Sequence, residues 1–184
     1  HEGAIVKYIL DTARKLGLEA KADKSGNVVV RKPASAGREN VGSVVLQGHL
    51  DMVCEKNKDT VHDFSKDPIT LVRKGNVLMA DGTTLGADNG IAVATNLAIM
   101  EDRSLSHGPL EFLFTIDEET GLTGANNLGR DFLAGSTAQF SIAFELNFMF
   151  VFLPFYIRAV SPMEDAATLR WTGLILGAAS ATAT

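Results

Sequence analysis

The sequence is short of cysteine, proline and positive charge, and each shortage excludes a class of protein. Its 184 residues include a single cysteine, Cys54, so no disulfide can form within the chain, as is typical of proteins in a reducing compartment. Five prolines and 17 glycines are too few for a collagen-like or proline-rich chain. A formal net charge of -5 leaves no basic surface for nucleic acid.

Long hydrophobic runs are also missing. The longest uninterrupted apolar run is residues 148–157, and its ten residues fall well short of the roughly 20 that a membrane-spanning helix needs. We therefore expect no membrane partner. No apolar leader precedes the first amphipathic segment, so no signal peptide is predicted. Because the chain begins with His1 rather than methionine, we expect a fragment or a processed chain.

What is present is a regular alternation of helical and extended patterns. Apolar residues at helical spacing predict helices over residues 2–16 and 90–101, and short apolar runs predict buried strands at 43–48 and 110–116. Further elements are predicted at the hairpins 18–22 with 27–31 and 69–72 with 77–80, and at the start of a helix within 121–128. Helices between such strands indicate the α/β class, with a mainly parallel sheet flanked by helices.

Three clusters of acidic or histidine residues adjoin these elements. His49 and Asp51 follow the first predicted buried strand. Asp88 precedes the second predicted helix, and Glu118 and Glu119 follow the second buried strand. Ligands collect at the carboxyl ends of strands in open α/β sheets, so the clusters are expected to converge.

Imidazole and carboxylate ligands together suit zinc, manganese or cobalt. His49 offers the nitrogen ligand, and Asp51 could hold its ring by accepting the other N–H. Asp88 could bridge two metals. In an extended segment Glu118 and Glu119 face opposite sides, so one could ligate metal while the other handles a water. Two metals about 3.5–4 Å apart are a recurrent device for activating water.

Structural explanations remain open for the same residues. An aspartate such as Asp88 before a helix is typical of a cap or turn, and adjacent glutamates after a strand are usually solvated. We interpret Cys54 as a small buried hydrophobic residue and His62 and His107 as loop residues.

Longer runs around these clusters resemble the M20 family of metallopeptidases, specifically its aminoacyl-histidine (Xaa-His) dipeptidase branch. The runs that carry the resemblance are residues 47–53, 62–69, 82–90, 107–111 and 118–121. The resemblance covers residues 1–135 and implies a partial M20-like catalytic domain. Residues 136–163 form an atypical Phe-rich segment, and residues 164–184 form a weakly matching tail that we expect to be poorly ordered.

The resemblance implies a role for each candidate residue. His49 and Glu119 would ligate metal and Asp88 would bridge two zinc ions, with manganese or cobalt as alternatives. Asp51 would orient His49, and Glu118 would be the general base that hydrolyses a dipeptide amide bond. The family also implies a small peptide substrate, a cytoplasmic location and homodimerisation through a separate lid domain. An M20 deacylase or aminocarboxypeptidase, or an inactive metal-binding module, is the alternative.

Two departures from the family pattern bear on activity. In the family a further ligand aspartate follows the glutamate pair, whereas residues 138–163 contain no aspartate and have Glu145 as their one acidic residue. A shift of reading frame over this stretch is our hypothesis for its composition. The lid domain and the family's last histidine ligand have no counterpart in the chain. We therefore expect little or no peptidase activity from this polypeptide alone.

Overall fold

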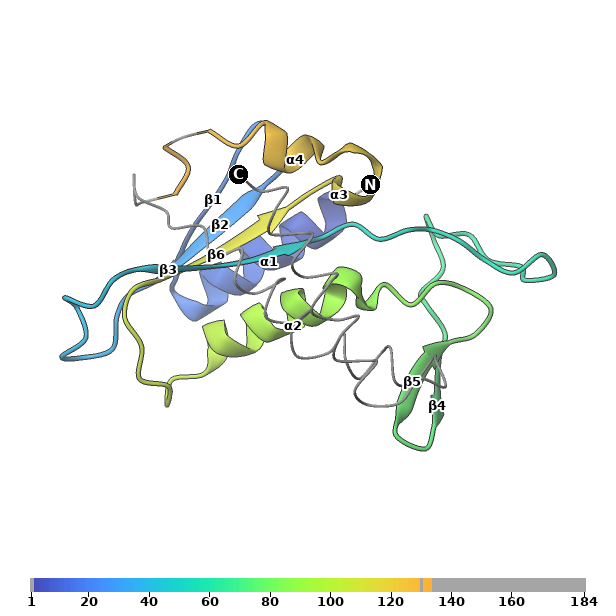
Figure 1. Cartoon of the computed structure of the whole chain (residues 1–184), viewed down its shortest axis with the longest axis horizontal. Helices are drawn as coiled ribbons and strands as arrows, with labels where there is room; N and C mark the ends of the chain where they lie inside the picture. The colour runs from blue at the N-terminus through green and yellow to red at the C-terminus, as the bar shows by residue number, and fades with distance from the viewer. Residues whose placement is uncertain (1, 130, 134–184) are drawn as a thin grey trace, which may run out of the picture. The chain divides into compact units, whose positions relative to one another are not determined.

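The computed structural model describes residues 2–129 and 131–133 (Figure 1). Its elements in chain order are α1 (Gly3–Leu16), β1 (Glu19–Ala22), β2 (Val28–Lys32), β3 (Val44–His49), β4 (Leu71–Lys74), β5 (Val77–Ala80), α2 (Ala87–Glu101), β6 (Leu110–Thr115), α3 (Glu118–Gly121) and α4 (Thr123–Asn126). The predicted helices, strands and hairpins are confirmed close to their expected bounds. Of the two strands predicted to be buried, β6 is buried throughout, whereas β3 is buried only at Gly48 and His49. The helix expected within 121–128 is instead a pair of short helices, because Leu122 between them has a left-handed φ of 54°.

Four strands form one sheet in the order β1-β2-β6-β3, and β4 pairs with β5 in a separate hairpin. The β1–β2 and β2–β6 pairs are antiparallel, whereas β3 and β6 are parallel. The α/β class is confirmed, but the expected mainly parallel arrangement is wrong for the described strands, which form a mixed sheet. A tight turn can join only antiparallel neighbours, and the parallel pair is joined through α2, a connection long enough for a crossover.

Both faces of the sheet are covered at its centre, where β6 is buried along its whole length. Phe112 and Phe114 face α1 and α2, where they pack in one cluster with Ile9 and Met100. Alternate residues of a strand point to opposite faces, so Leu113 lies on the other side. There it packs with Val29, Phe132 and Leu133. Figure 1 shows both long helices beneath the sheet, on the first of these faces.

Helix α2 lies unusually close to β3 at Gly48. A Cβ atom placed on this glycine would lie 3.0 Å from the Cβ of Ala92, so any side chain here would require the helix to shift. This close approach brings the first turn of α2 to the end of β3. The backbone of Asp88 and Asn89 is not helical, and regular helix geometry begins at Gly90, as the sequence predicted.

Two further predictions concern membrane-spanning helices and the C-terminal part of the chain. None of the described helices has the length and hydrophobicity needed to cross a membrane. The Phe-rich segment 136–163, Glu145 within it and the tail 164–184 lie outside the described residues.

Candidate metal centre

The site is built where the two parallel strands end. His49, the last residue of β3, is in register with Thr115, the last residue of β6. The backbone N–H of Leu50 donates to the carbonyl of Thr115 at 2.8 Å, and the Gln47 side chain donates to the Thr115 hydroxyl at 3.0 Å. These bonds hold the two strand ends side by side. The residues that follow each strand therefore emerge at the same edge of the sheet.

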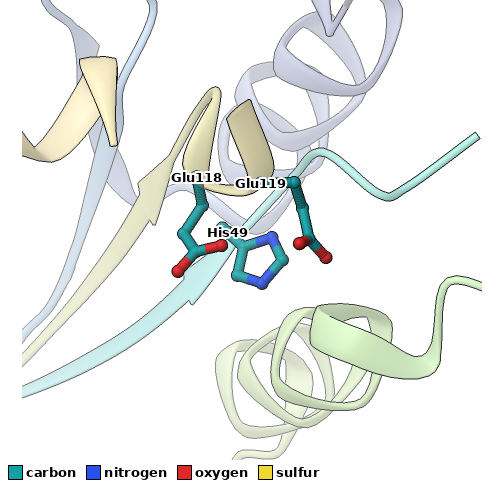
Figure 2. A group of neighbouring side chains, drawn as sticks. All are labelled: His49, Glu118 and Glu119. Atoms are coloured by element: carbon teal, nitrogen blue, oxygen red, sulfur yellow. The ribbon is translucent and has the colours of Figure 1, made fainter. Parts of the chain in front are cut away.

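Three side chains from these two strand ends meet at one point. One ring nitrogen of His49 and one carboxylate oxygen each from Glu118 and Glu119 all lie within 4.8 Å of one another. Figure 2 shows the two carboxylates on either side of the imidazole. The His49 side chain is buried, Glu118 is half-buried and Glu119 is exposed. One nitrogen and two oxygen donors this close together can hold a divalent cation such as zinc.

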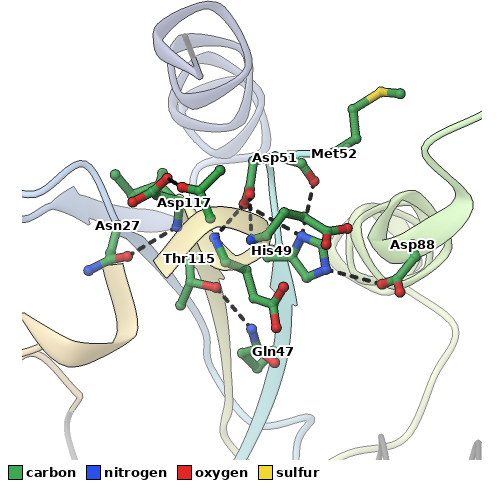
Figure 3. A network of polar contacts seen from close by, with 12 residues as sticks. Asn27, Gln47, His49, Asp51, Met52, Asp88, Thr115 and Asp117 are labelled. Carbon is green, nitrogen blue, oxygen red and sulfur yellow. Dashed lines mark hydrogen bonds and ion pairs between the residues drawn. The ribbon is translucent and has the colours of Figure 1, made fainter. Parts of the chain in front are cut away.

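Asp51 joins the two strand ends by hydrogen bonds. One of its carboxylate oxygens accepts the backbone N–H of Glu118 and the other accepts that of Glu119, both at 3.0 Å (Figure 3). The Nδ1 atom of His49 lies 3.0 Å from the backbone oxygen of Asp51 and 3.5 Å from its carboxylate. The ring is thus held by the carbonyl of Asp51 more closely than by the carboxylate that the sequence favoured. The carboxylate instead caps the glutamate pair.

Asp88 approaches the imidazole from the start of α2. Its Oδ1 atom lies 3.1 Å from Nε2 of His49, although 86% of its side chain is exposed. When Nδ1–H donates to the carbonyl of Asp51, Nε2 of a neutral ring carries a lone pair, which faces a carboxylate oxygen. Two acceptors at this distance require a proton or a cation with them. Two ligand atoms on one tetrahedral zinc are about 3.3 Å apart, so the spacing suits a shared metal ion.

The electrostatics of the cluster favour a cation as well. Burial by itself would lower the pKa of His49, but the hydrogen bond that its protonated ring donates to the Asp88 carboxylate, together with the carbonyl and charge of Asp51, raises it overall. Burial raises the pKa of Glu118, and the negative charges of Glu119, Asp51 and Asp88 add to this while His49 opposes it. Negative charge thus contributes to both shifts: it outweighs burial at His49 and adds to burial at Glu118.

The structure thus brings all five predicted residues together, but not always as predicted. The glutamate pair lies in the first turn of α3 rather than in an extended segment, so both carboxylates reach His49 instead of facing opposite sides. Cys54 is exposed, so its interpretation as a buried hydrophobic residue is wrong. His62 and His107 lie outside the group of donors found in the described residues. Sequence reasoning missed Asn27 and Thr115, because a turn asparagine and a strand threonine carry no distinguishing pattern.

Comparison with known proteins decides the family. Residues 45–153, more than half of the chain, match the peptidase family M20/M25/M40. The chain belongs to this family. The cytosol non-specific dipeptidase of Escherichia coli strain K12 is 51% identical over 133 residues, which cover 72% of this chain and 27% of that protein.

Solved structures of M20 relatives agree with this assignment. The crystal structure of an aminoacylhistidine dipeptidase from Vibrio alginolyticus matches with 50% identity and a TM-score of 0.71, over 73% of this chain and 28% of that chain. Aminopeptidase PepT from Bacillus cereus matches with 26% identity and a TM-score of 0.56, over 73% of this chain and 36% of that chain. The chain therefore spans between 27% and 36% of the length of these relatives. The resemblance found from the motifs is confirmed.

Proposed function

We propose that this chain supplies metal-binding and proton-transfer residues for the hydrolysis of dipeptides. The observation that carries the proposal is the meeting of His49, Glu118 and Glu119 at the ends of two parallel strands, with Asp88 against the same imidazole. Two relatives of about 50% identity are named as dipeptidases, which supports this substrate class over an acylated amino acid.

The proposed metal ligands are His49, Asp88 and Glu119. Their imidazole and carboxylate donors suit zinc, with manganese or cobalt as alternatives, and the bridging role proposed for Asp88 would make the centre dinuclear. A bound metal pair would polarise the peptide carbonyl and increase the acidity of water. Asp51 acts indirectly: its carbonyl fixes one nitrogen of the His49 ring, and its carboxylate fixes the backbone of both glutamates.

Glu118 is the proposed general base. It is half-buried, and burial raises its pKa, so its carboxylate is a stronger base than an exposed glutamate. In the proposed reaction it accepts a proton from the attacking water and passes it to the leaving amine. The exposed Glu119 lies beside it, where a ligand role and a base role can be divided between neighbours.

Substrate and location follow from the relatives as proposals. The aminoacylhistidine dipeptidase match favours a small dipeptide with a C-terminal histidine. The cytosol non-specific dipeptidase match, together with the single cysteine, favours the cytoplasm. Dimerisation through a lid domain and low activity of this polypeptide alone both stay predictions.

Metal binding tests the proposal more directly than turnover, because the chain spans 27% of the E. coli relative. The experiment measures the zinc affinity and stoichiometry of the full chain by competition with a chromogenic chelator. His49→Ala should weaken the tightest site at least about tenfold, and Asp88→Ala should remove the second ion. His107→Ala, a histidine in a loop outside the donor cluster, is the control and should bind as the unaltered chain does. Zinc affinity that is unchanged by His49→Ala would overturn the proposal.

A further inference from the structure

The segment that carries the two glutamates is closed at its base. We call residues 117–123 the acidic segment. The residues on either side of it are bonded to each other, since the N–H of Gly124 donates to the carbonyl of Ile116 at 3.1 Å. One step further in, the N–H of Thr123 donates to the carbonyl of Asp117 at 3.1 Å. The acidic segment is therefore a short loop whose two ends touch.

A single buried side chain from a distant hairpin reaches both ends of this loop. Asn27 follows the turn between β1 and β2 and has none of its surface exposed. Its Nδ2 donates to the carbonyl of Gly124 at 2.9 Å, and its Oδ1 accepts the N–H of Ile116 at 3.3 Å. Figure 3 shows Asn27 aimed at the end of β6, beside the polar network of the metal centre.

The orientation of Asn27 is itself fixed by Asp23. One carboxylate oxygen of Asp23 accepts Nδ2 of Asn27 at 2.7 Å, and the other accepts the backbone N–H groups of Ser25, Gly26 and Asn27. The turn therefore sets which way the amide points. An asparagine that served only the turn would need none of the bonds to residues 116 and 124, which are 89 and 97 positions away.

The contact at Gly124 leaves no spare room. A Cβ atom at this position would lie 2.4 Å from Oδ1 of Asn27 and 2.5 Å from the carbonyl oxygen of Ile116. Both distances are far below van der Waals contact. The base of the loop can close on Asn27 in this way only because residue 124 has no side chain.

We propose that Asn27 is a positioning residue for the metal centre. It fixes the base of the acidic segment, while Asp51 fixes the backbone N–H groups of Glu118 and Glu119 within the segment. The two anchors together set the direction of the two carboxylates. The expected effect on metal binding rests on the proposed function. The expected effect on the position of the acidic segment does not.

The test uses two readouts on the full chain. Amide hydrogen exchange by NMR without metal reports on the loop, and zinc affinity by chelator competition reports on the centre. Asn27→Ala should speed exchange of the Glu118 and Glu119 amides at least about tenfold and weaken zinc binding about tenfold, as loss of groups that support metal ligands does. Val30→Ala changes a fully buried residue of β2, the strand that follows Asn27, which packs against α1 and α2, and it is the control for general destabilisation. It should speed exchange of the Glu118 and Glu119 amides no more than that of the sheet amides, and it should leave zinc affinity unchanged.

A second variant separates the turn from the loop. The double variant Asp23→Asn/Asn27→Asp exchanges the two side chains, so a carboxylate and an amide still face each other in the turn. It removes the donor to the carbonyl of Gly124. The Ser25 and Gly26 amides should therefore keep their protection, while Glu118 and Glu119 should exchange as fast as in Asn27→Ala. This variant also keeps the test decisive if Asn27→Ala does not fold.

The possible failures can be told apart. Exchange of Glu118 and Glu119 that stays at its normal rate in the exchanged double variant would overturn the positioning role, whatever the chain does with zinc. A chain that binds no zinc, but whose acidic segment loosens as expected, would overturn the proposed function and leave the loop anchor standing. Zinc affinity that does not fall when the loop loosens would limit Asn27 to a structural role.

Discussion

The two sides of the candidate metal centre are built in different ways. On one side, His49, Glu118 and Glu119 stand at the ends of two parallel strands, and each is bonded to Asp51 through its ring or its backbone. On the other side, Asp88 extends from a non-helical residue at the start of α2, with 86% of its side chain exposed and a bond to His49.

The donors on the first side are preorganised for a ligand, whereas the carboxylate on the second side can adjust to one. The strand-end side is positioned by the sheet core, so its donors are aimed before any ligand arrives. The helix side depends on how closely α2 lies against β3, and its carboxylate is free to adjust to a ligand. We therefore expect substitutions on the strand-end side to change metal affinity most. Substitutions where α2 packs against β3 should mainly lower the free energy of unfolding and weaken binding of the second ion.

The largest effect is expected from Asp51→Ala. This change leaves the Glu118 and Glu119 amides without their acceptor and should lower zinc affinity about 10–100-fold, since groups that support metal ligands typically contribute that much. Asp51→Asn keeps one acceptor oxygen, so its zinc affinity should lie between that of the unaltered chain and that of Asp51→Ala. Chelator competition measures both, and an unchanged affinity in Asp51→Ala would break the distinction between the two sides.

A smaller effect, and one on the helix side, is expected from Gly48→Val. The new side chain would collide with Ala92 and push α2 away from β3, which should cost about 1–3 kcal/mol of stability in urea unfolding. It should also weaken the second zinc site more than the first, because Asp88 moves with the helix. Gly90→Ala is the matched control on the same helix, where a Cβ atom meets nothing within 4 Å. That variant should be neutral or slightly stabilising.

The smallest effect concerns an ordinary surface loop and sets a baseline for the centre. Asp63 is exposed, and hydrogen bonds from Lys66 and Ser65 lower its pKa to about 2. Because the pKa is lower in the folded chain, the stabilisation is complete above the ordinary value of 3.8 and is lost as the pH falls toward 2. An NMR titration should show Asp63 protonating last and Glu118, whose pKa is raised, protonating earlier.

Removing the partner of Asp63 checks the cause. Lys66→Met takes away the largest contribution and should bring the midpoint of Asp63 back toward 3.8, with no effect on zinc affinity. Titration of Asp63 near its ordinary value in the unaltered chain would contradict the loop geometry.

Local sequence pattern was enough to predict most elements of this fold, but it did not predict which distant strands pair. Helix α1 and strands β3 and β6 follow from apolar spacing and from the glycines that border them. The sheet's mixed direction could not be predicted, because it depends on β2 pairing with β6, some 80 positions along the chain. No periodicity within either strand records that partner.

The residues of the site could be predicted from the sequence, but the hydrogen bonds that position them could not. His49, Asp88 and the glutamate pair could be found because each adjoins a predicted element. The part played by Asp51 depends on α3 beginning at Glu118, where two free backbone N–H groups face its carboxylate. The bonds of Asn27 to Ile116 and Gly124 depend on close packing of segments far apart in sequence. Neither feature has a sequence signal.

The most direct measurement of the central claim is X-ray absorption at the zinc edge of the zinc-loaded full chain. The account predicts a shell of nitrogen and oxygen ligands at about 2.0–2.1 Å, with imidazole scattering that disappears in His49→Ala. A sulfur ligand at about 2.3 Å, which only Cys54 or a methionine could supply, or imidazole scattering that survives in His49→Ala, would contradict it.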